Sequence, residues 1–398
     1  MSAEPRGTHP CGTGPRGAEP RGAEPRTDRP SGLSNGGAGP GRAPGKRLRI
    51  GILFGGRSAE HEVSIVSAQG VMAALDTDRF QAVPIGVTRQ GTWLTLAQTE
   101  QALRRILSER LRSLDEPLGE GLLYRTQVIG SFRRLDIVFP LIHGANGEDG
   151  TLQGFLELAG VPYVGAGVAA SALGMDKALQ KTVFRQGGIP VTDDIVVLNS
   201  EWRRDPAGVR QAAEAAIGYP CFVKPANSGS SIGTAKVRSR EDLDEAIAEA
   251  LRYDRKVLIE KAVAAREVEV AVLGNDEPEA SPVGEITYRS EFYDYRAKYD
   301  DPHTELHIPA AIPQATAERL RETALAAYRA IDCAGLARVD FFLKPDGEFC
   351  LNEVNTIPGF TPMSMYPRLW EYAGLSYRDL ITRLIELGLE RHQEKRRV

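Results

Sequence analysis

The feature that most limits how this chain can fold is a hairpin pattern in residues 338–355. Two strand-like runs flank Asp346 and Gly347, a dipeptide that favours a tight β-hairpin turn. We place these two residues at the centre of the turn and count outward from them. The resulting register pairs Pro345 with Glu348, Phe341 with Asn352, Asp340 with Glu353, and Arg338 with Asn355.

This register sorts the hairpin side chains onto two faces, because successive residues of a strand point to opposite sides. One face is apolar and would be buried. It carries Val339, Phe341, Leu343, Cys350 and Val354. The other face presents Arg338, Asp340, Glu353 and Asn355.

Two carboxylates meet on the polar face. Directly opposed residues have Cβ atoms about 4.5–5.5 Å apart, and two carboxylates about 4 Å apart repel by roughly 4 kcal/mol at an effective dielectric constant of about 20. We therefore expect a cation between Asp340 and Glu353. Together with the amide oxygen of Asn355 they form a hard-oxygen donor set that suits Mg²⁺ bound to a nucleotide. The alternative is a solvated face neutralised by Arg338.

Two glycine-rich segments are candidates for binding phosphate. Residues 224–233 follow a short strand, and their backbone N–H groups, with Ser230, Ser231 and the charge of Lys224, could surround phosphate oxygens. The segment is not a Walker loop because no Gly-Lys-Ser/Thr ends it, and alone it could be a surface loop. Residues 165–170 imitate a dinucleotide fingerprint, but they fall at a domain junction.

The order of strand-like and helical patterns predicts an extension and three domains. Residues 1–46 are rich in Gly, Pro and Arg and cannot bury enough apolar area to fold, so we expect a disordered extension. Residues 47–165 alternate strand and helix, with strands near 50–54, 80–87 and 136–142, which predicts a mostly parallel sheet.

The remaining two domains are predicted at 166–263 and 264–398. In the first we expect strands at 221–224, 234–237 and 256–260, with helices at 175–186, after the Asp205-Pro206 cap, and after a Ser239–Asp242 capping box. The second opens with the alternating residues 267–272, which indicate a half-buried antiparallel strand.

Composition excludes several classes of protein. Hydrophobic residues make up 42% and charged residues 26% of the chain, the balance of a globular protein. The formal net charge of −4 argues against a nucleic-acid partner, and the sequence has no apolar run of about 18 residues that predicts a membrane partner. Four scattered cysteines without a C-x-x-C pair predict neither a disulfide framework nor a zinc site. We expect a cytoplasmic protein that acts on small molecules.

Six segments, taken in order, resemble the D-alanine–D-alanine ligase family of the ATP-grasp superfamily. They are residues 51–64, 143–150, 172–177, 224–233, 292–299 and 352–361, and the resemblance spans about residues 48–385. It implies an ATP-grasp fold of two α+β subdomains preceded by a Rossmann-like α/β N-terminal domain. It also implies ATP-dependent ligation of two D-alanine molecules through a D-alanyl phosphate, for peptidoglycan precursor synthesis, by a homodimer.

The resemblance also implies nucleotide and metal ligands. ATP would contact Lys177 and Lys224 at its phosphates, Glu260 with the backbone of Lys261 and Val263 at adenine, and Glu267 at ribose. Ser231 and Lys298 are further expected ATP-binding residues. Two Mg²⁺ ions, with Mn²⁺ as a substitute, would lie on Asp340, Glu353 and Asn355.

The substrate residues follow in the same way. Glu62 would bind the ammonium of the first D-alanine, and Ser364 the carboxylate of the second. Ser230 would link Glu62 to the lid residue Tyr299. Arg338 and the Gly359 N–H would lie where charge develops on the tetrahedral intermediate. The chain departs from the family pattern at Arg296, where relatives often carry Glu, and at Ala145-Asn146.

Other readings of the same residues stay open. A D-alanine:D-lactate ligase would share most of these motifs. A non-catalytic ATP-grasp nucleotide-binding protein is a second alternative, although it would not need the full metal set together with Arg338. A nicotinamide oxidoreductase would rest on residues 165–170 alone. Taken singly, Glu62 could merely complement a helix dipole and Ser364 could be an ordinary turn residue.

Overall fold

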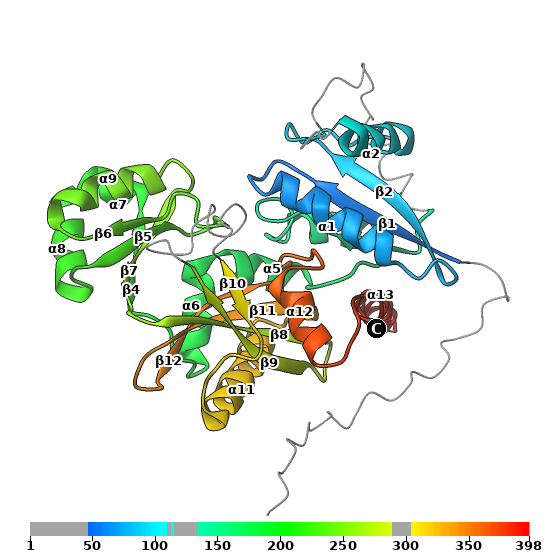
Figure 1. The fold of residues 1–398 in the computed structure, drawn as a ribbon. Coiled ribbons are helices and arrows are strands. Elements are labelled where there is room, and N and C mark those ends of the chain that lie inside the picture. The colour runs from blue at the N-terminus through cyan, green and yellow to red at the C-terminus, as the bar shows by residue number, and fades with distance from the viewer. Residues whose placement is uncertain (1–46, 110–112, 115–131, 133, 289–303, 398) are drawn as a thin grey trace, which may run out of the picture. The chain divides into compact units, whose positions relative to one another are not determined.

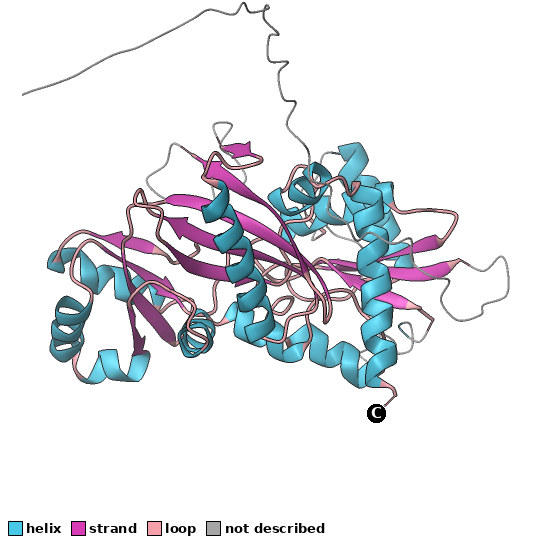
Figure 2. Cartoon of the chain, turned by 90° about the horizontal axis from the view of Figure 1, so that it is seen from below, coloured by secondary structure: helices cyan, strands magenta, loops and turns pink. Residues whose placement is uncertain are grey.

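The computed structural model describes residues 47–109, 113–114, 132, 134–288 and 304–397 (Figure 1). The predicted extension at 1–46 and the lid residues Arg296, Lys298 and Tyr299 lie outside the described residues. The described strands form three sheets, and helices lie against them (Figure 2). None of the described helices combines the length and apolarity that a membrane crossing requires.

The first sheet is parallel, as predicted. It has the order β2-β1-β3. Its strands are β1 (Leu48–Gly55), β2 (Phe80–Val87) and β3 (Ile137–Pro140), and its described helices are α1 (His61–Ala74), α2 (Leu96–Glu109) and α4 (Thr151–Ala159). A Cβ atom at Gly55 would lie 2.1 Å from the carbonyl oxygen of Val87, so only glycine fits where the chain leaves β1. That turn directs the start of α1 to the carboxyl end of the sheet.

The second sheet is antiparallel, with the order β4-β7-β5-β6. Its elements are β4 (Asp194–Leu198), α7 (Asn199–Arg204), α8 (Pro206–Ala216), β5 (Cys221–Pro225), β6 (Ala235–Val237), α9 (Arg240–Ala250) and β7 (Lys256–Lys261). The Asp205 carboxylate accepts the Gly208 N–H at 2.9 Å and caps α8 as predicted. The capping box predicted for α9 is wrong, because the Ser239 hydroxyl donates to Asp242 at 3.2 Å instead of accepting from the backbone.

The third sheet is antiparallel, with the order β10-β9-β8-β11-β12. Its strands are β8 (Arg266–Gly274), β9 (Glu279–Thr287), β10 (Glu305–His307), β11 (Gly335–Leu343) and β12 (Phe349–Asn355). The helices α11 (Gln314–Ala330) and α12 (Met365–Tyr372) pack against it. The prediction that residues 267–272 are half-buried is wrong, because every residue from Val268 to Gly274 is buried.

Within the described ranges, three further helices pack between or beside the sheets. α5 (Val168–Met175) and α6 (Lys177–Gln186) precede the second sheet in sequence, yet they share an apolar core with the third. α13 (Tyr377–Lys395) comes last in the chain and packs against α1, β3 and β8. The domain boundaries at 165/166 and 263/264 stay predictions.

The predicted hairpin of β11 and β12 is present with one correction to its register. Arg338 pairs with Asn355 and Asp340 with Glu353 as predicted, but Phe341 pairs with Leu351. The Lys344 N–H donates to the Glu348 carbonyl at 2.8 Å, so the turn is one residue longer than expected. A bulge after Asp340 compensates for the longer turn.

The same correction changes one face of the hairpin. Cys350 pairs with Phe342, so it does not join Val339, Phe341 and Leu343 on the apolar face. Leu351 and Phe349 fill the core there instead. The polar pairs nevertheless keep their predicted places, because the extra turn residue and the bulge cancel beyond Asp340.

Candidate active site

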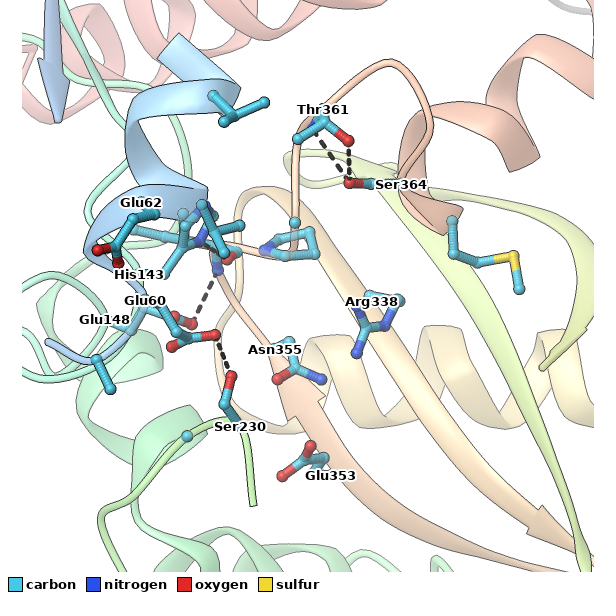
Figure 3. Close-up of a pocket in the computed structure, with 18 of the residues that line it drawn as sticks. Glu60, Glu62, His143, Glu148, Ser230, Arg338, Glu353, Asn355, Thr361 and Ser364 are labelled. Atoms are coloured by element: carbon cyan, nitrogen blue, oxygen red, sulfur yellow. Dashed lines mark hydrogen bonds between the residues drawn. The ribbon is translucent and has the colours of Figure 1, made fainter. Parts of the chain in front are cut away.

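A cavity of about 1380 Å³ lies where strands of the third sheet meet loops and helices that adjoin the other two sheets (Figure 3). It is lined by the start of α1, the 143–148 loop, the junction of α5 and α6, the 228–232 loop, β8, β11, β12 and the loop that leads to α12. The predicted residues that line it are Glu62, Lys177, Ser230, Arg338, Glu353, Asn355, Gly359 and Ser364.

Other predicted residues lie elsewhere. Lys261 and Val263 line a second cavity of about 390 Å³ beside Lys344 at the hairpin turn. Glu267 lies on β8 and accepts a hydrogen bond from the Tyr288 hydroxyl at 2.5 Å. These three residues belong to the predicted adenine and ribose contacts.

The two opposed carboxylates of the hairpin each have a cationic partner. The Arg338 guanidinium donates two hydrogen bonds to Asp340, at 2.8 and 2.7 Å. The Lys177 ammonium lies 3.2 Å from a Glu353 oxygen. The repulsion expected between Asp340 and Glu353 is therefore offset by protein side chains as well as by any bound cation.

The predicted metal ligands present hard oxygen atoms. Asn355 donates its amide N–H to Asp340 at 2.9 Å, which turns its own carbonyl oxygen away from that carboxylate. Across the described ranges no group of three or more His, Cys, Asp or Glu residues is arranged to hold a metal ion. Two carboxylates and one amide oxygen nevertheless fit Mg²⁺, which commonly completes its shell with water and substrate phosphates.

Arg338 lies on β11 of the third sheet and is held by two carboxylates. Its Nε atom lies 3.0 Å from a carboxylate oxygen of Glu269, which is 3% exposed on the neighbouring strand β8. The same Nε and the neighbouring Nη2 donate to the two carboxylate oxygens of Asp340. A planar cation fixed in this way can stabilise negative charge that develops in the cavity without reorganising first.

A buried ionic cluster surrounds Glu260. The sequence predicted only part of it. Lys224 contacts one of its carboxylate oxygens at 2.8 Å, and Lys181 of α6 contacts the other. Lys181 also lies 3.5 Å from Asp194. Burial acts to raise the pKa of Glu260, but Lys224 and Lys181 overcome it and lower the pKa to about 2. Lys181 was missed because its partners lie on strands distant in sequence.

The 224–233 loop, which is predicted to bind phosphate, has an unusual backbone. Ser230 and Ser231 both adopt positive φ, at 49° and 57°, a region that non-glycine residues rarely occupy. Lys177 donates to the Ser228 carbonyl at 2.8 Å and so joins the loop to the start of α6. Strained backbone of this kind is often found at ligand sites, where the surrounding structure holds it in place.

Ser230 contacts Glu60, and the link predicted to Glu62 is wrong. The Ser230 hydroxyl donates to a Glu60 carboxylate oxygen at 2.5 Å (Figure 3). Glu62 instead pairs with Arg89. Residues two apart at a helix start point in different directions, so only one of the two glutamates can face the loop. Cβ atoms placed at Gly144 or Gly229 would each lie 3.1 Å from Glu60, which shows how closely both backbones approach it.

His143 and Glu148 also line the cavity and were not assigned roles from the sequence. The buried His143 ring and the Glu148 carboxylate both contact backbone atoms of Ile357. Loss of hydration and the nearby Glu60 raise the pKa of Glu148 to about 8, and burial lowers the pKa of His143. His143 and Glu148 belong to a segment that matches the family motif, but their contacts need the folded chain.

Ser364 lies at the N-terminal cap of α12. Its hydroxyl accepts the Thr361 N–H at 3.1 Å and lies 2.8 Å from the Thr361 hydroxyl. The N-terminal end of a helix favours an anion, so this edge of the cavity suits a carboxylate. A Cβ at Gly359 would lie 3.2 Å from the Ser364 hydroxyl, so the two residues are packed closely.

Gly165, which begins the segment that imitates a dinucleotide fingerprint, has a packing role. It adopts a φ of 94°, and a Cβ at the neighbouring Gly335 would lie 2.9 Å from its Cα. The positive φ of Gly165 therefore accounts for this glycine without a bound dinucleotide, and the close backbone contact accounts for Gly335.

Comparisons with known proteins agree with these features. The family model described as D-ala D-ala ligase N-terminus matches residues 49–166, and that described as D-ala D-ala ligase C-terminus matches residues 183–386. A D-alanine–D-alanine ligase of Deinococcus radiodurans is 51% identical over 347 residues, which cover 86% of this chain and 99% of the relative. One of Geobacillus thermodenitrificans is 46% identical, with coverages of 88% and 98%.

Solved structures give the same fold. The D-alanine-D-alanine ligase of Coxiella burnetii has a TM-score of 0.73 and 36% identity, covering 88% of this chain and 96% of that one. The VanG D-Ala:D-Ser ligase of Enterococcus faecalis also has a TM-score of 0.73, with 37% identity and coverages of 86% and 100%. These likenesses confirm the predicted fold class, an ATP-grasp fold preceded by an α/β N-terminal domain.

Proposed function

Because the chain belongs to the D-alanine–D-alanine ligase family, we propose that it joins two D-alanine molecules at the expense of ATP. The products would be D-alanyl-D-alanine, ADP and phosphate. The observation that carries the proposal is the arrangement of one cavity. It joins the Asp340–Glu353 hairpin, the fixed Arg338 and the Glu60–Ser230 contact within reach of the N-terminus of α12.

ATP would lie along the ionic residues between the second and third sheets. We assign its phosphates to Lys177, Lys224, Ser231 and Lys298, its adenine to Glu260, Lys261 and Val263, and its ribose to Glu267. Lys224 and Lys177 now pair with Glu260 and Glu353, so bound phosphates would compete with these carboxylates for the two ammonium groups. That competition supports a role for both lysines in sensing the nucleotide.

Two Mg²⁺ ions, replaceable by Mn²⁺, would be held by Asp340, Glu353 and Asn355. When bound, they would offset negative charge on the phosphates. The support is the hard-oxygen donor set on paired strands.

The amino-acid substrates would lie on the opposite side of the cavity. We assign the ammonium of the first D-alanine to Glu60 in place of Glu62, because Glu60 is the residue held by Ser230. The carboxylate of the second D-alanine would lie at Ser364 and the N-terminus of α12. Tyr299, which lies outside the described residues, stays a proposed substrate-site residue.

The reaction would proceed in two steps. A carboxylate oxygen of the first D-alanine attacks the γ-phosphorus of ATP, which forms D-alanyl phosphate and releases ADP. The neutral amine of the second D-alanine then attacks the acyl carbon, and the tetrahedral intermediate expels phosphate and loses a proton from nitrogen. Arg338 and the Gly359 N–H would stabilise the negative oxygen of that intermediate.

The choice of second substrate needs a direct test, because one structural relative is a D-Ala:D-Ser ligase. We propose a strong preference for D-alanine over D-lactate and D-serine. Equal concentrations of the three would be supplied with ATP and Mg²⁺ at pH 7, and the products would be separated by mass. Depsipeptide or D-alanyl-D-serine in amounts comparable to the dipeptide would contradict the preference but not the ligase chemistry.

A second assay separates the ligase from a non-catalytic nucleotide-binding protein. Phosphate release that requires D-alanine, ATP and Mg²⁺ together supports the ligase, whereas ATP binding without turnover supports the alternative. A cytoplasmic location, a homodimer and the lack of nucleic-acid or membrane partners stay proposals.

A further inference from the structure

One residue of the β12–α12 connection is held through both of its backbone polar groups. The Ile357 carbonyl accepts a hydrogen bond from His143 Nδ1 at 2.9 Å, and the Ile357 N–H donates to the Glu148 carboxylate at 3.4 Å. His143 and Glu148 precede Ile357 by 214 and 209 residues. The 143–148 loop thus forms a clamp around one peptide unit from a distant part of the chain.

The His143 half of the clamp has a defined tautomer. A carbonyl oxygen can only accept, so Nδ1 must carry the proton that it donates to Ile357. Nε2 is then an acceptor, and the Ser67 hydroxyl lies 3.4 Å from it. The ring is 2% exposed and its pKa is lowered by burial, in agreement with a neutral imidazole.

The Glu148 half is fixed by its own loop. A second carboxylate oxygen accepts the Gly144 N–H at 2.6 Å, and the Glu148 N–H donates to the Gly144 carbonyl at 2.9 Å. A Cβ at Gly147 would lie 1.9 Å from the Ile142 carbonyl oxygen, so the loop can take this tight course only with glycine there. These contacts fix the Glu148 carboxyl group independently of its contact with Ile357.

The residues that follow Ile357 show which group the clamp positions. The next residue is Pro358, whose ring fixes its φ angle, and Gly359 follows directly. Few torsion angles therefore separate the clamped peptide from the Gly359 N–H. Fixing Ile357 limits where that N–H can point.

We propose that His143 and Glu148 are positioning residues that orient the Gly359 N–H toward the tetrahedral intermediate by clamping Ile357. This inference rests on the proposed ligase function. It also assigns to the N-terminal domain a task in the chemistry beyond substrate binding, because the clamp comes from the loop after β3. A small displacement of a catalytic donor can cost a large factor in rate, so the clamp should affect turnover more than nucleotide binding.

The test compares two variants of one loop. In Glu148→Gln only one side-chain oxygen remains, so at most one of the two N–H groups keeps its acceptor. The matched control is Asp149→Asn. Asp149 also accepts two backbone N–H groups, from Asn146 at 2.8 Å and Thr151 at 3.0 Å, but its hydrogen bonds stay within the loop and the start of α4.

We expect Glu148→Gln to lower kcat about tenfold or more while KM for ATP changes less than twofold. Asp149→Asn should keep kcat within about twofold of the wild type, even if its Tm falls as far as that of Glu148→Gln. Combining Glu148→Gln with His143→Gln should lower kcat by less than the product of the single effects, since both act on one peptide. Full kcat in Glu148→Gln, or equal losses in both loop variants, would overturn the proposal.

A second readout does not depend on turnover. Amide hydrogen exchange over residues 355–361 should be faster in Glu148→Gln than in the wild type and unchanged in Asp149→Asn. Unchanged exchange in Glu148→Gln would overturn the clamp itself. A wild-type protein that makes no dipeptide would instead contradict the proposed function, and the exchange experiment would still decide whether the clamp exists.

Discussion

The ammonium of Lys181 contacts the carboxylate of Glu260 in a part of the protein almost closed to solvent. The two side chains are 1% and 3% exposed, and they join α6 to β7. Lys224 contacts the other oxygen of the same carboxylate. If bound phosphates take Lys224, Lys181 stays as the partner that keeps Glu260 ionised at the proposed adenine site.

Replacing Lys181 with Met should destabilise the protein and weaken nucleotide binding. Removing one member of a buried ion pair leaves the other charge without its partner, which lowers the free energy of unfolding by about 3 kcal/mol. We expect that loss in urea unfolding at pH 7, together with a KM for ATP raised at least fivefold. The matched control is Lys236→Met, which removes a lysine from β6 of the same sheet. Equal effects of the two substitutions would contradict a specific role for Lys181.

The same variant should change how stability depends on pH. The folded-state pKa of Glu260 lies near 2, below the value of 4.5 for a free carboxyl, so its contribution is present above pH 4.5 and is lost as pH falls towards 2. Lys181→Met should bring the folded-state pKa of Glu260 closer to 4.5. The wild type should therefore lose more unfolding free energy than the variant between pH 6 and 3, and equal losses would contradict this origin of the shift.

The hairpin carboxylates should differ in what they contribute to stability. Asp340→Asn and Glu353→Gln should each reduce Mg²⁺-dependent turnover at least a hundredfold. Asp340→Asn should also lower the free energy of unfolding by about 1–3 kcal/mol, because it leaves the partly buried Arg338 guanidinium against an amide. Glu353→Gln should cost less, since Lys177 keeps its contact with Ser228.

The control for this pair is Glu348→Gln at the exposed end of the same hairpin. Glu348 pairs with Arg319 at 3.3 Å on the surface, so its removal should leave both turnover and stability nearly unchanged. Turnover at low Mg²⁺ close to that of the wild type in either carboxylate variant would rule out the metal assignment.

Two glutamates at the start of α1 give a sharp comparison. Glu60→Gln should raise KM for D-alanine at least tenfold, because it removes the charge held by Ser230. Glu62→Gln should change it less than threefold, since Glu62 pairs with Arg89 in a partly exposed ion pair. Steady-state kinetics with D-alanine as the varied substrate measure both. A larger effect at Glu62 would restore the assignment made from the sequence.

Local patterns predicted most of the strands and helices that place the site, but contacts between distant segments could not be predicted. The pairs Arg338–Asn355 and Asp340–Glu353 were found because the turn and the bulge shift the register by equal and opposite amounts. Nothing in the sequence of β12 signals that bulge. Cys350 was assigned to the wrong face for the same reason.

The choice between Glu60 and Glu62 illustrates a second limit. Both residues lie in the segment that resembles the family, and both line the cavity. Only the position of Ser230, 170 residues later, distinguishes them. Lys181, His143 and Glu148 were missed because their partners come from other parts of the fold.

The most direct test of the central claim follows one oxygen atom through the reaction. D-alanine labelled with ¹⁸O in both carboxylate positions would be supplied with unlabelled ATP and Mg²⁺, and the released phosphate and the dipeptide would be analysed by mass spectrometry. A D-alanyl phosphate intermediate predicts that each phosphate carries one ¹⁸O and that one is released per D-alanyl-D-alanine formed. Unlabelled phosphate, label in AMP, or ATP consumption without dipeptide would contradict the account.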